Sequence, residues 1–457
     1  MSADKASSTA AGSVKLDSVR ALQYALYRSA KADPGRRFHA LRDKVYRRDV
    51  LRRAWVLVRR NNGAPGIDAT TLAEVEEYGV DRLLDELAED LRNGRWRPSP
   101  AWRVFIPKPG TTDQRPLSIP TVRDRIVGAA LKIVLEPVFE ADFLPCSFGF
   151  RPRRSAHDAL QVLIDESWQG RRWVVETDIA DCFEAIPHEE LMRAVEERVC
   201  DQGVLRLLRA MLRAGVMQDG RVRRPVTGTP QGGVISPLLA RSDYHVYLHQ
   251  LDRAWSADEH GVLVRYADDV VVMCRSREQA EAALARLTAL LAELGLQPKL
   301  AKTRIVHLVE GGEGLDFLGF HNRLVRGWTP RSAHLTFLAR WPARKAVRHA
   351  RDRIRLITAR SRLLVPVEQI VEELNLFLRG WAGYFRYGNS ALLLGQIRNF
   401  ALCRLALWLS KRGNRRRAWG WGMTQVLLSP NHLGLISLDG IVVPPRPLRA
   451  WKVECRR

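Results

Sequence analysis

The sequence lacks paired cysteines, long apolar runs and a secretory start. Its six cysteines stand apart, without a C-x-x-C pair or a Cys/His cluster, and this spacing argues against a zinc module or a disulfide framework. No stretch approaches the ~18 consecutive apolar residues of a membrane-spanning helix, and no basic segment followed by an apolar one opens the chain. We therefore expect a cytoplasmic protein with no membrane partner, and association with the nucleoid is compatible with that expectation.

Acidic residues are scarce toward the C-terminus. Residues 323–457 carry 26 lysines and arginines but 6 aspartates and glutamates, so they hold +20 of the formal charge of +23. An excess of that size repels itself unless a polyanion is near. An anionic membrane would favour a basic amphipathic helix, whereas this segment interleaves arginine with tryptophan, as stacking surfaces for nucleic acid do. Nucleic acid is therefore the favoured partner.

The chain of 457 residues is 46% hydrophobic, which is enough for packed cores. Apolar residues at helical spacing predict helices within 16–60 and at 80–91, 155–168, 189–199, 204–214 and 277–294. Beta-branched runs predict strands at 104–106, around Arg115, and at 173–178, 262–266 and 270–273. After about residue 330 the pattern is helical up to Arg412. Strand and helix alternate over roughly 170–310, which predicts an α+β core.

Three aspartates stand where their carboxylates would converge. Asp178 ends one predicted strand, and Asp268 with Asp269 form the predicted two-residue turn of a hairpin. Turns of this type favour Gly or Asn, so a functional reason for two acids is favoured. If the strands are neighbours in one sheet, these oxygens suit two Mg²⁺ ions about 3.5–4 Å apart, which activate a 3′-hydroxyl and stabilise the leaving pyrophosphate. The chemistry would be nucleotidyl transfer, and spacing alone leaves Asp181 and Glu184 open as further ligands.

Residues 228–233, Gly-Thr-Pro-Gln-Gly-Gly, form a glycine-rich loop before an apolar helix start. Glycine permits close approach of the backbone to a nucleotide or a template strand. The loop has neither the Gly-Lys-Ser/Thr ending of a Walker A motif nor the spacing of a dinucleotide fingerprint, so by itself a plain loop remains the favoured interpretation.

Taken together, these segments resemble bacterial group II intron reverse transcriptases, also called intron-encoded maturases. The segments that carry the resemblance are, in order, RVFIPKP at 103–109 with RPL at 115–117, SFGFRP at 147–152, DIADCF at 178–183, TPQGGVISP at 229–237, YADD at 266–269, 299–303, and LDFLGF at 315–320. Residues 45–48 and 63–68 resemble the N-terminal extension of that family, and 374–375 with 378–385 resemble its maturase thumb region. The match spans about residues 40 to 410.

The resemblance implies a right-hand polymerase with fingers, a palm of antiparallel sheet and helices, and a helical thumb. It implies an RNA-directed DNA polymerase that uses two Mg²⁺ ions, or Mn²⁺ in their place, and deoxynucleoside triphosphates. The catalytic residues it implies are Asp178, Asp268 and Asp269. The same three residues would bind the metal ions, with the Ile179 carbonyl as an extra ligand.

The resemblance also implies a nucleotide pocket built from Lys108, Arg115, Phe183 and Gln231. Lys108 and Arg115 would meet the phosphates, since a triphosphate needs cationic partners as charge moves to pyrophosphate. The Phe183 ring would lie under the sugar and clash with a 2′-hydroxyl, and a core role for this ring is the alternative. Gln231 would line the pocket.

Family members bind their own intron RNA, help it fold for splicing, and copy it into DNA at a target site. The expected partners are therefore structured intron RNA, an RNA template with a DNA primer, target DNA and deoxynucleoside triphosphates. Two groups of residues are predicted RNA contacts, one in an N-terminal basic helix and one in the thumb: Arg47, Arg48, Arg52, Arg379, Trp381, Tyr384 and Arg386. For Trp381 and Tyr384 core packing is an equal alternative.

The expected domains are a tail and helix at 1–40, an extension of the fingers at 41–100, fingers and palm at 101–325, a helical thumb with maturase character at 326–410, and a basic C-terminal tail at 411–457. The tail has no cysteine pair, so we expect no endonuclease. Residues 241–244 look inserted relative to the family pattern. Two other functions stay open: a free-standing reverse transcriptase recruited to defence or repair, and an RNA-splicing cofactor with little polymerase activity.

Overall fold

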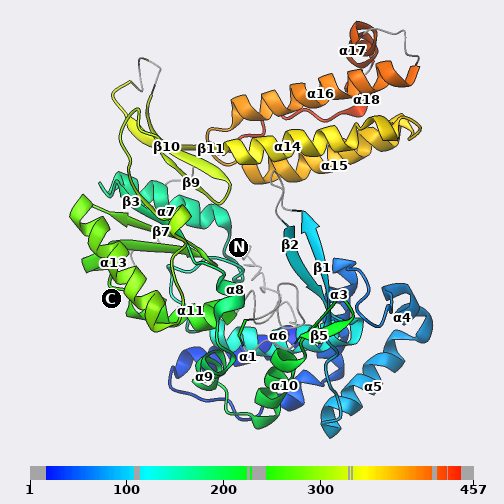
Figure 1. Ribbon diagram of the computed structural model, residues 1–457, viewed down its shortest axis with the longest axis vertical. Helices are drawn as coiled ribbons and strands as arrows, with labels where there is room; N and C mark the ends of the chain where they lie inside the picture. Colours follow the sequence, from blue (N-terminus) through cyan, green and yellow to red (C-terminus); the bar gives the residue numbers. More distant parts are fainter. Residues whose placement is uncertain are drawn as a thin grey trace, which may run out of the picture. The chain divides into compact units, whose positions relative to one another are not determined.

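The computed structural model describes residues 17–107, 114–223, 227–228, 243–327, 330, 333–413, 419–429 and 431–443. The chain divides into two compact units, which Figure 1 shows in sequence colours. The first unit comprises segments within 1–104, 116–143 and 183–249, and the second comprises segments within 105–115, 144–182 and 250–457.

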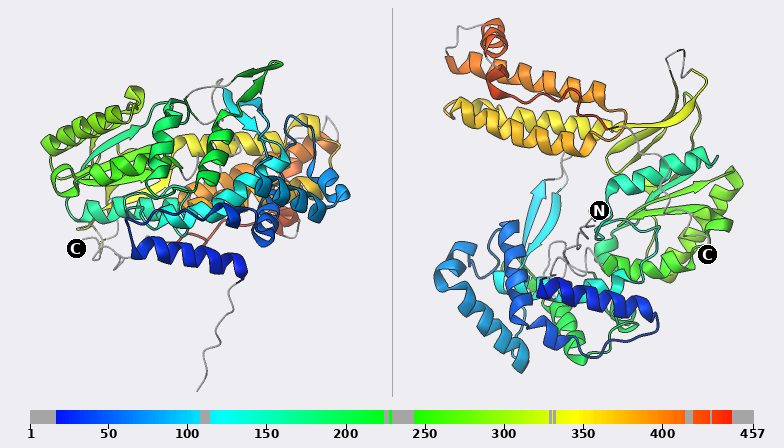
Figure 2. Two further views of the ribbon diagram at one scale, coloured as in Figure 1. Left: turned by 90° about the horizontal axis from the view of Figure 1, so that it is seen from below. Right: turned by 180° about the vertical axis from the view of Figure 1, so that it is seen from behind.

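The first unit is mainly helical. Its long helix α6 packs against α1 and α3, and Figure 2 shows α1 running beside α6. Apolar stripes explain these contacts, as in α5, where Leu83, Leu84, Leu87 and Leu91 are all buried. The helices are α1 Ser18–Ala32, α2 Arg42–Val45, α3 Arg48–Asn61, α4 Leu72–Tyr78, α5 Val80–Asn93, α6 Val122–Glu140, α8 Cys182–Ala185, α9 His188–Glu196 and α10 Gln202–Arg213. Helix α11 Asp243–Ala254 begins in this unit, and its residues from 250 onward, Asp252 among them, belong to the second unit.

A small four-stranded sheet has the order β2-β1-β4-β5. Its strands are β1 Ala101–Pro107, β2 Gln114–Ile119, β4 Val216–Gln218 and β5 Arg221–Arg223. The predicted strand around Arg115 is thus present as β2. The sequence did not predict β4 and β5, which are three residues long.

The central sheet of the second unit has the order β6-β7-β3-β8, and every neighbouring pair in it is antiparallel. Its strands are β3 Trp173–Asp178, β6 Val262–Tyr266, β7 Asp269–Cys274 and β8 Arg304–His307. Helices α7 Ala156–Trp168 and α13 Arg277–Glu293 pack against this sheet. Strands that are covered by helices read as continuous Val/Ile/Leu runs, which is why the sequence predicted three of them.

A second, three-stranded sheet has the order β11-β10-β9, formed by β9 Leu315–Phe317, β10 Phe320–Arg326 and β11 Thr336–Pro342. The prediction of an almost wholly helical chain after about residue 330 was therefore wrong at β11. This strand pairs along its whole length with β10, and pairing with a distant strand overrides the weak local pattern.

Three helices of the second unit lie side by side, as Figures 1 and 2 show: α14 Arg344–Ile357, α15 Val367–Phe385 and α16 Ala391–Gly413. The shorter helices are α12 Ala257–His260, α17 Trp419–Leu428 and α18 Asn431–Gly434. Helix α16 is long and apolar enough to cross a membrane by length and composition. Leu394, Ile397, Ala401 and Leu405 of this helix are fully buried in the core, however, and a core helix of a soluble protein meets the same criterion.

The predicted α+β class is confirmed, because helices and several small sheets make up the described residues. The arrangement of fingers, palm and thumb around a cleft and the five domain boundaries stay predictions.

Candidate active site

Two of the three predicted catalytic aspartates lie directly across from one another. Strand β3 ends at Asp178 and β7 begins at Asp269, and the antiparallel register pairs these two residues. Their carboxyl groups are hydrogen-bonded to each other. The sequence prediction that the strands are neighbours whose acids meet at one sheet edge is thus confirmed for this pair.

Asp268 lies in the hairpin turn beside them. The register pairs Tyr266 with Asp269, so the two-residue turn consists of Ala267 and Asp268, not of the two aspartates as predicted. Asp269 instead contributes the first residue of β7, where it can pair with β3. Ala267 has φ 58°, the left-handed conformation that the first position of such a turn requires. The Asp268 carbonyl accepts a hydrogen bond from the Ile179 amide at 3.1 Å, which ties the turn to the end of β3.

The surroundings of Asp178 and Asp269 oppose ionisation of both carboxyl groups at once. Burial, the hydrogen bond with Asp178 and the charge of Asp178 all raise the pKa of Asp269, and Asp268 adds to the rise. Burial also opposes ionisation of Asp178, but hydrogen bonds with Asp269 and Lys302 outweigh it and hold the pKa of Asp178 below its usual value. Two carboxylates in contact cannot both ionise without a cation, so the site favours binding of positive charge.

The structure adds Lys302 to the site. Its Nζ contacts Asp178 Oδ2, and the Asp178 carbonyl accepts a hydrogen bond from the Lys299 amide at 2.7 Å. Burial opposes the charge on Lys302, but the hydrogen bond with Asp178 outweighs it and raises the pKa of Lys302. Lys302 is not among the predicted site residues, although it lies inside the motif at 299–303.

A buried ion pair contacts the turn of the hairpin. Arg265 of β6 is fully buried and bonds Asp252 at 2.8 Å through Nε and at 2.5 Å through Nη2. The same guanidinium donates to Ser147 Oγ at 3.0 Å and to the Ala267 carbonyl at 3.3 Å. An arginine inside an apolar strand, Val-Leu-Val-Arg-Tyr, is the sequence signal for such a buried partner, because an unpaired buried charge is strongly unfavourable.

The donors predicted for this site are all oxygens, namely three aspartate carboxylates and the Ile179 carbonyl, the type that Mg²⁺ prefers. Within the described ranges, no group of three or more His, Cys, Asp or Glu side chains converges closely enough to hold a metal ion. The fit to a divalent cation thus rests on donor chemistry and on the unfavourable charge of the Asp178–Asp269 pair.

The predicted nucleotide pocket is described only in part. Arg115 belongs to β2 and Phe183 belongs to α8, but the positions of both side chains lie outside the description. Lys108 and Gln231 lie outside the described residues altogether. Their assignment to the nucleotide therefore stays a prediction.

The predicted N-terminal RNA contacts are engaged in ion pairs. Arg47 bonds Asp49 at 2.6 Å, and Arg48 and Arg52 both bond Asp81, at 3.3 and 2.5 Å. All these groups are partly exposed, and exposed ion pairs contribute little free energy. The RNA contacts of the three arginines stay a prediction.

In and next to α15, the structure separates the other four predicted RNA contacts. Arg379 is exposed and Arg386 is half-buried. Trp381 is 8% exposed and packs in the core, with its ring centroid 4.8 Å from that of Phe385. The covered ring favours core packing, the alternative that the sequence left open for Trp381, and its contact with RNA stays a prediction.

Tyr384 is likewise tied to the core of the second unit. Its hydroxyl donates to the Leu318 carbonyl at 2.8 Å, and its ring packs 5.5 Å from Phe320 and 5.1 Å from His157. The alternative of core packing, which the sequence left open, therefore describes Tyr384 as well, and its RNA contact stays a prediction.

Two protein families match this chain in succession. Residues 106–322 match the family "Reverse transcriptase (RNA-dependent DNA polymerase)", and residues 347–427 match "Group II intron, maturase-specific domain". The first range contains all three aspartates, Lys302 and the Arg265–Asp252 pair. The second range contains most of α14, with α15 and α16.

Individual proteins are also similar to this chain. Protein YkfC of Escherichia coli K12 is 33% identical over 334 residues, which cover 65% of this chain and 86% of that protein. Group II intron-encoded protein LtrA of Lactococcus lactis is 35% identical over 211 residues, which cover 46% of this chain and 34% of LtrA. A nuclear intron maturase of Arabidopsis thaliana mitochondria is 32% identical over 107 residues, 23% of this chain and 14% of that protein. The chain thus spans most of one relative and much smaller parts of the others.

Proposed function

Because the chain belongs to the family of group II intron reverse transcriptases and maturases, we propose that its reverse transcriptase domain extends a DNA primer on an RNA template at Asp178, Asp268 and Asp269. The observation that carries the proposal is the cross-strand pairing of Asp178 with Asp269, next to the turn that holds Asp268. This pairing brings acids from distant parts of the sequence to one edge of a buried sheet.

Two Mg²⁺ ions, when bound by these carboxylates and the Ile179 carbonyl, would supply an activated 3′-hydroxyl and stabilise the leaving pyrophosphate. The protein residues have their own tasks. Asp178 and Asp269 form a pair in which Asp269 keeps its proton until a divalent cation binds and offsets the second negative charge. Lys302 holds the Asp178 carboxylate in one orientation, and the Arg265–Asp252 pair fixes the turn from which Asp268 projects.

The nucleotide pocket and the RNA contacts complete the proposal. Lys108 and Arg115 would bind the triphosphate, Gln231 would line the pocket, and Phe183 would exclude a 2′-hydroxyl. The maturase-specific domain implies binding of intron RNA, and we propose that Arg379 and Arg386, together with the N-terminal arginines, bind its phosphates in support of splicing and copying at a DNA target. We place this activity in the cytoplasm.

Primer extension on poly(rA)/oligo(dT) with Mg²⁺ tests the assignment. Asp269→Asn keeps the side-chain shape but removes the charge, so extension should fall by at least about 10³-fold, as expected when a metal ligand of a nucleotidyl transferase is lost. RNA binding should stay within a few-fold of the unaltered protein. Asp258→Asn, which alters an exposed acid in α12, is the matched control and should keep full activity.

The same experiment discriminates between the remaining functions. A splicing cofactor with little polymerase activity would show equally weak extension for the unaltered protein and for Asp269→Asn. Loss of RNA binding together with extension would instead assign Asp269 a structural role and contradict the proposal.

A further inference from the structure

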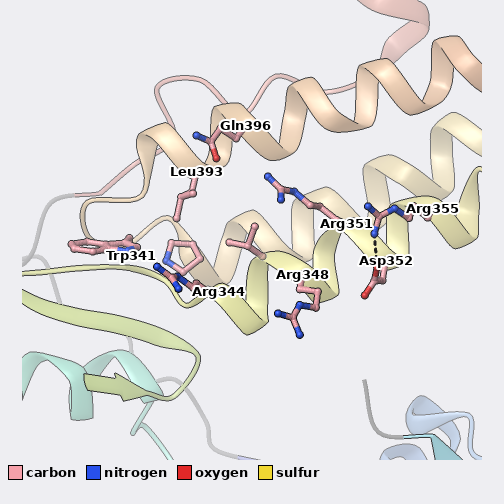
Figure 3. Close-up of a pocket in the computed structure, with 10 residues that line it drawn as sticks. Trp341, Arg344, Arg348, Arg351, Asp352, Arg355, Leu393 and Gln396 are labelled. Atoms are coloured by element: carbon pink, nitrogen blue, oxygen red, sulfur yellow. Dashed lines mark hydrogen bonds and ion pairs between the residues drawn. The ribbon is translucent and has the colours of Figure 1, made fainter. Parts of the chain in front are cut away.

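A groove lined by arginines lies between α14 and α16. It has a volume of about 710 Å³, and its lining includes Trp341 from the end of β11, Leu393 and Gln396 from α16, and several residues of α14. Figure 3 shows Trp341 and Arg344 at one end of the groove, Arg355 at the other, and Arg351 pointing toward α16. Trp341 is half-buried, so part of its ring remains accessible.

The groove carries an unbalanced positive charge. Its ten lining residues include four arginines, Arg344, Arg348, Arg351 and Arg355, against a single acid, Asp352, which bonds Arg355 at 2.7 Å. The guanidinium groups of Arg351 and Arg355 lie 5.8 and 5.4 Å from the centre of the Phe400 ring. Arg351 Nε is buried and has no hydrogen-bond partner among the described residues. Such a row of cations fits an extended anion.

A second hollow extends the groove past Trp341. It has a volume of about 600 Å³ and shares Trp341 and Arg344 with the first. It adds Arg304 and Arg323, together with the acids Glu313 and Asp316, so its charge is more balanced than that of the first. His321 lies directly opposite Trp341 in the sheet, with 5.2 Å between the ring centroids, which fixes the tryptophan ring from one side. Residues 344 to 355 span about 16 Å, because an α-helix rises about 1.5 Å per residue. The row of arginines on α14 is therefore long and narrow, and Trp341 lies at its end, where the two hollows meet.

We propose that a strand of nucleic acid lies in this groove, with consecutive phosphates on Arg344, Arg351 and Arg355 and with a base stacked on Trp341. The length of the arginine row exceeds what a single phosphate or a nucleotide would occupy. The combination of a cationic track and an aromatic surface is typical of single-strand binding. This inference rests on the proposed function only in that the chain handles RNA, and the groove uses none of the residues assigned to polymerisation.

Fluorescence anisotropy with a short mixed-sequence RNA, measured over a range of salt concentrations without nucleotides, tests the groove. The double variant Arg344→Ala, Arg351→Ala removes two phosphate partners. Its plot of log Kobs against log salt should be shallower by about 1.4, because each contact to a single strand contributes about 0.7 to the slope. Affinity near 0.1 M salt should fall on the order of tenfold or more.

Lys345→Ala with Arg353→Ala is the matched control. These residues are exposed, lie on the same helix outside the groove lining, and carry the same total charge. This control should change the slope by less than half as much. If the control and the groove variant lose affinity and slope equally, only net charge matters and the proposed groove is wrong. Thermal unfolding of each variant shows whether it remains folded, and Arg351→Lys, which retains the charge, should recover most of the slope.

Trp341→Ala tests the stacked base. Affinity should fall on the order of tenfold while the salt slope is unchanged, since stacking involves no counterion release, and Trp341→Phe should restore much of it. An unchanged affinity for Trp341→Ala would contradict the stacking part.

Parallel titrations with the DNA strand of the same sequence and with the RNA duplex identify the source of the strand. A preference for single-stranded RNA supports a template or an unpaired intron segment as the ligand, and a preference for single-stranded DNA supports the primer or target strand. A preference for the duplex overturns the single-strand proposal. Since no polymerisation is measured, a protein that binds through the groove but cannot extend a primer would refute the proposed activity and leave the groove intact.

Discussion

Arg265 and Asp252 form an ion pair in which both side chains are 0% exposed, with 2.5 Å between Arg265 Nη2 and Asp252 Oδ2. The guanidinium reaches onward to Ser147 and to the carbonyl of Ala267 in the hairpin turn. One buried arginine thus connects the segment that contains Ser147, the helix α11 and the turn that carries Asp268. The pair acts on the candidate active site through position, because the guanidinium holds the carbonyl of Ala267, the residue next to Asp268.

Asp252→Asn should destabilise the protein strongly. It leaves the Arg265 guanidinium buried without its counter-charge, and breaking a buried ion pair from one side costs about 3–5 kcal/mol. The double variant Arg265→Met, Asp252→Leu should recover much of that loss, since no charge remains to be buried. Urea unfolding curves of the three proteins measure both effects. If Asp252→Asn and the unaltered protein had equal free energies of unfolding, the ion pair would not contribute to stability.

The parts of the fold that follow local patterns were predictable, and those that depend on distant partners were not. The apolar run at 173–178 reads as a buried strand and is β3, and the helix predicted at 277–294 is α13, one residue shorter. Strand β11 was missed because its pairing with β10, not its own sequence, makes it a strand. The same holds for the candidate active site. The three aspartates were predictable from their motifs, whereas the contact of Lys302 with Asp178 joins residues 124 positions apart and was not.

Asp269→Asn should change stability as well as activity. Without metal, the folded protein keeps a proton on Asp269 to a higher pH than the unfolded chain does. Stability is therefore lost as pH rises through the folded pKa, and the uncharged Asn removes that loss. In metal chelator the variant should have the higher Tm at neutral pH, and added Mg²⁺ should raise the Tm of the unaltered protein more than that of the variant. An identical Mg²⁺ response in both proteins would argue against Asp269 as a metal ligand.

Because of Asp124, the free energy of unfolding of the first unit should decrease as pH rises through the mildly acidic range. Asp124 is 2% exposed, and burial raises its pKa from 3.8 to about 6, although its Oδ2 accepts a hydrogen bond from the Ser99 amide at 3.0 Å. The shift corresponds to about 3 kcal/mol of unfolding free energy, present below pH ~4 and lost as pH rises through 6. Asp124→Asn retains an acceptor for Ser99, so its stability should be nearly flat across this range. Unfolding measured at several pH values checks the difference.

Trp381 and Arg379 should behave oppositely although they are two residues apart in α15. Trp381→Ala empties a core site and should destabilise the protein by about 3–5 kcal/mol. Arg379→Ala alters an exposed side chain and should leave the Tm within a degree or two while lowering RNA affinity at low salt. Measuring the Tm and the RNA Kd of each variant separates the two roles. A stable Trp381→Ala protein that has lost RNA binding would restore the stacking role for that tryptophan.

Gly149→Ala should slow polymerisation. A Cβ at this position would lie 2.6 Å from the Ala267 amide nitrogen and 3.1 Å from the Tyr266 carbonyl carbon. Both neighbours are backbone atoms, so either the segment containing Gly149 or the hairpin turn must move, and the turn carries Asp268. Small displacements of catalytic groups lower kcat on the order of 10²-fold. Gly383→Ala is the matched control: no atom lies within 4 Å of its added Cβ, and alanine stabilises an exposed helix by about 0.5–1 kcal/mol. If Gly149→Ala retained full kcat at an unchanged Mg²⁺ requirement, the hairpin turn would tolerate movement, and the positioning role of the residues packed beneath it would be refuted.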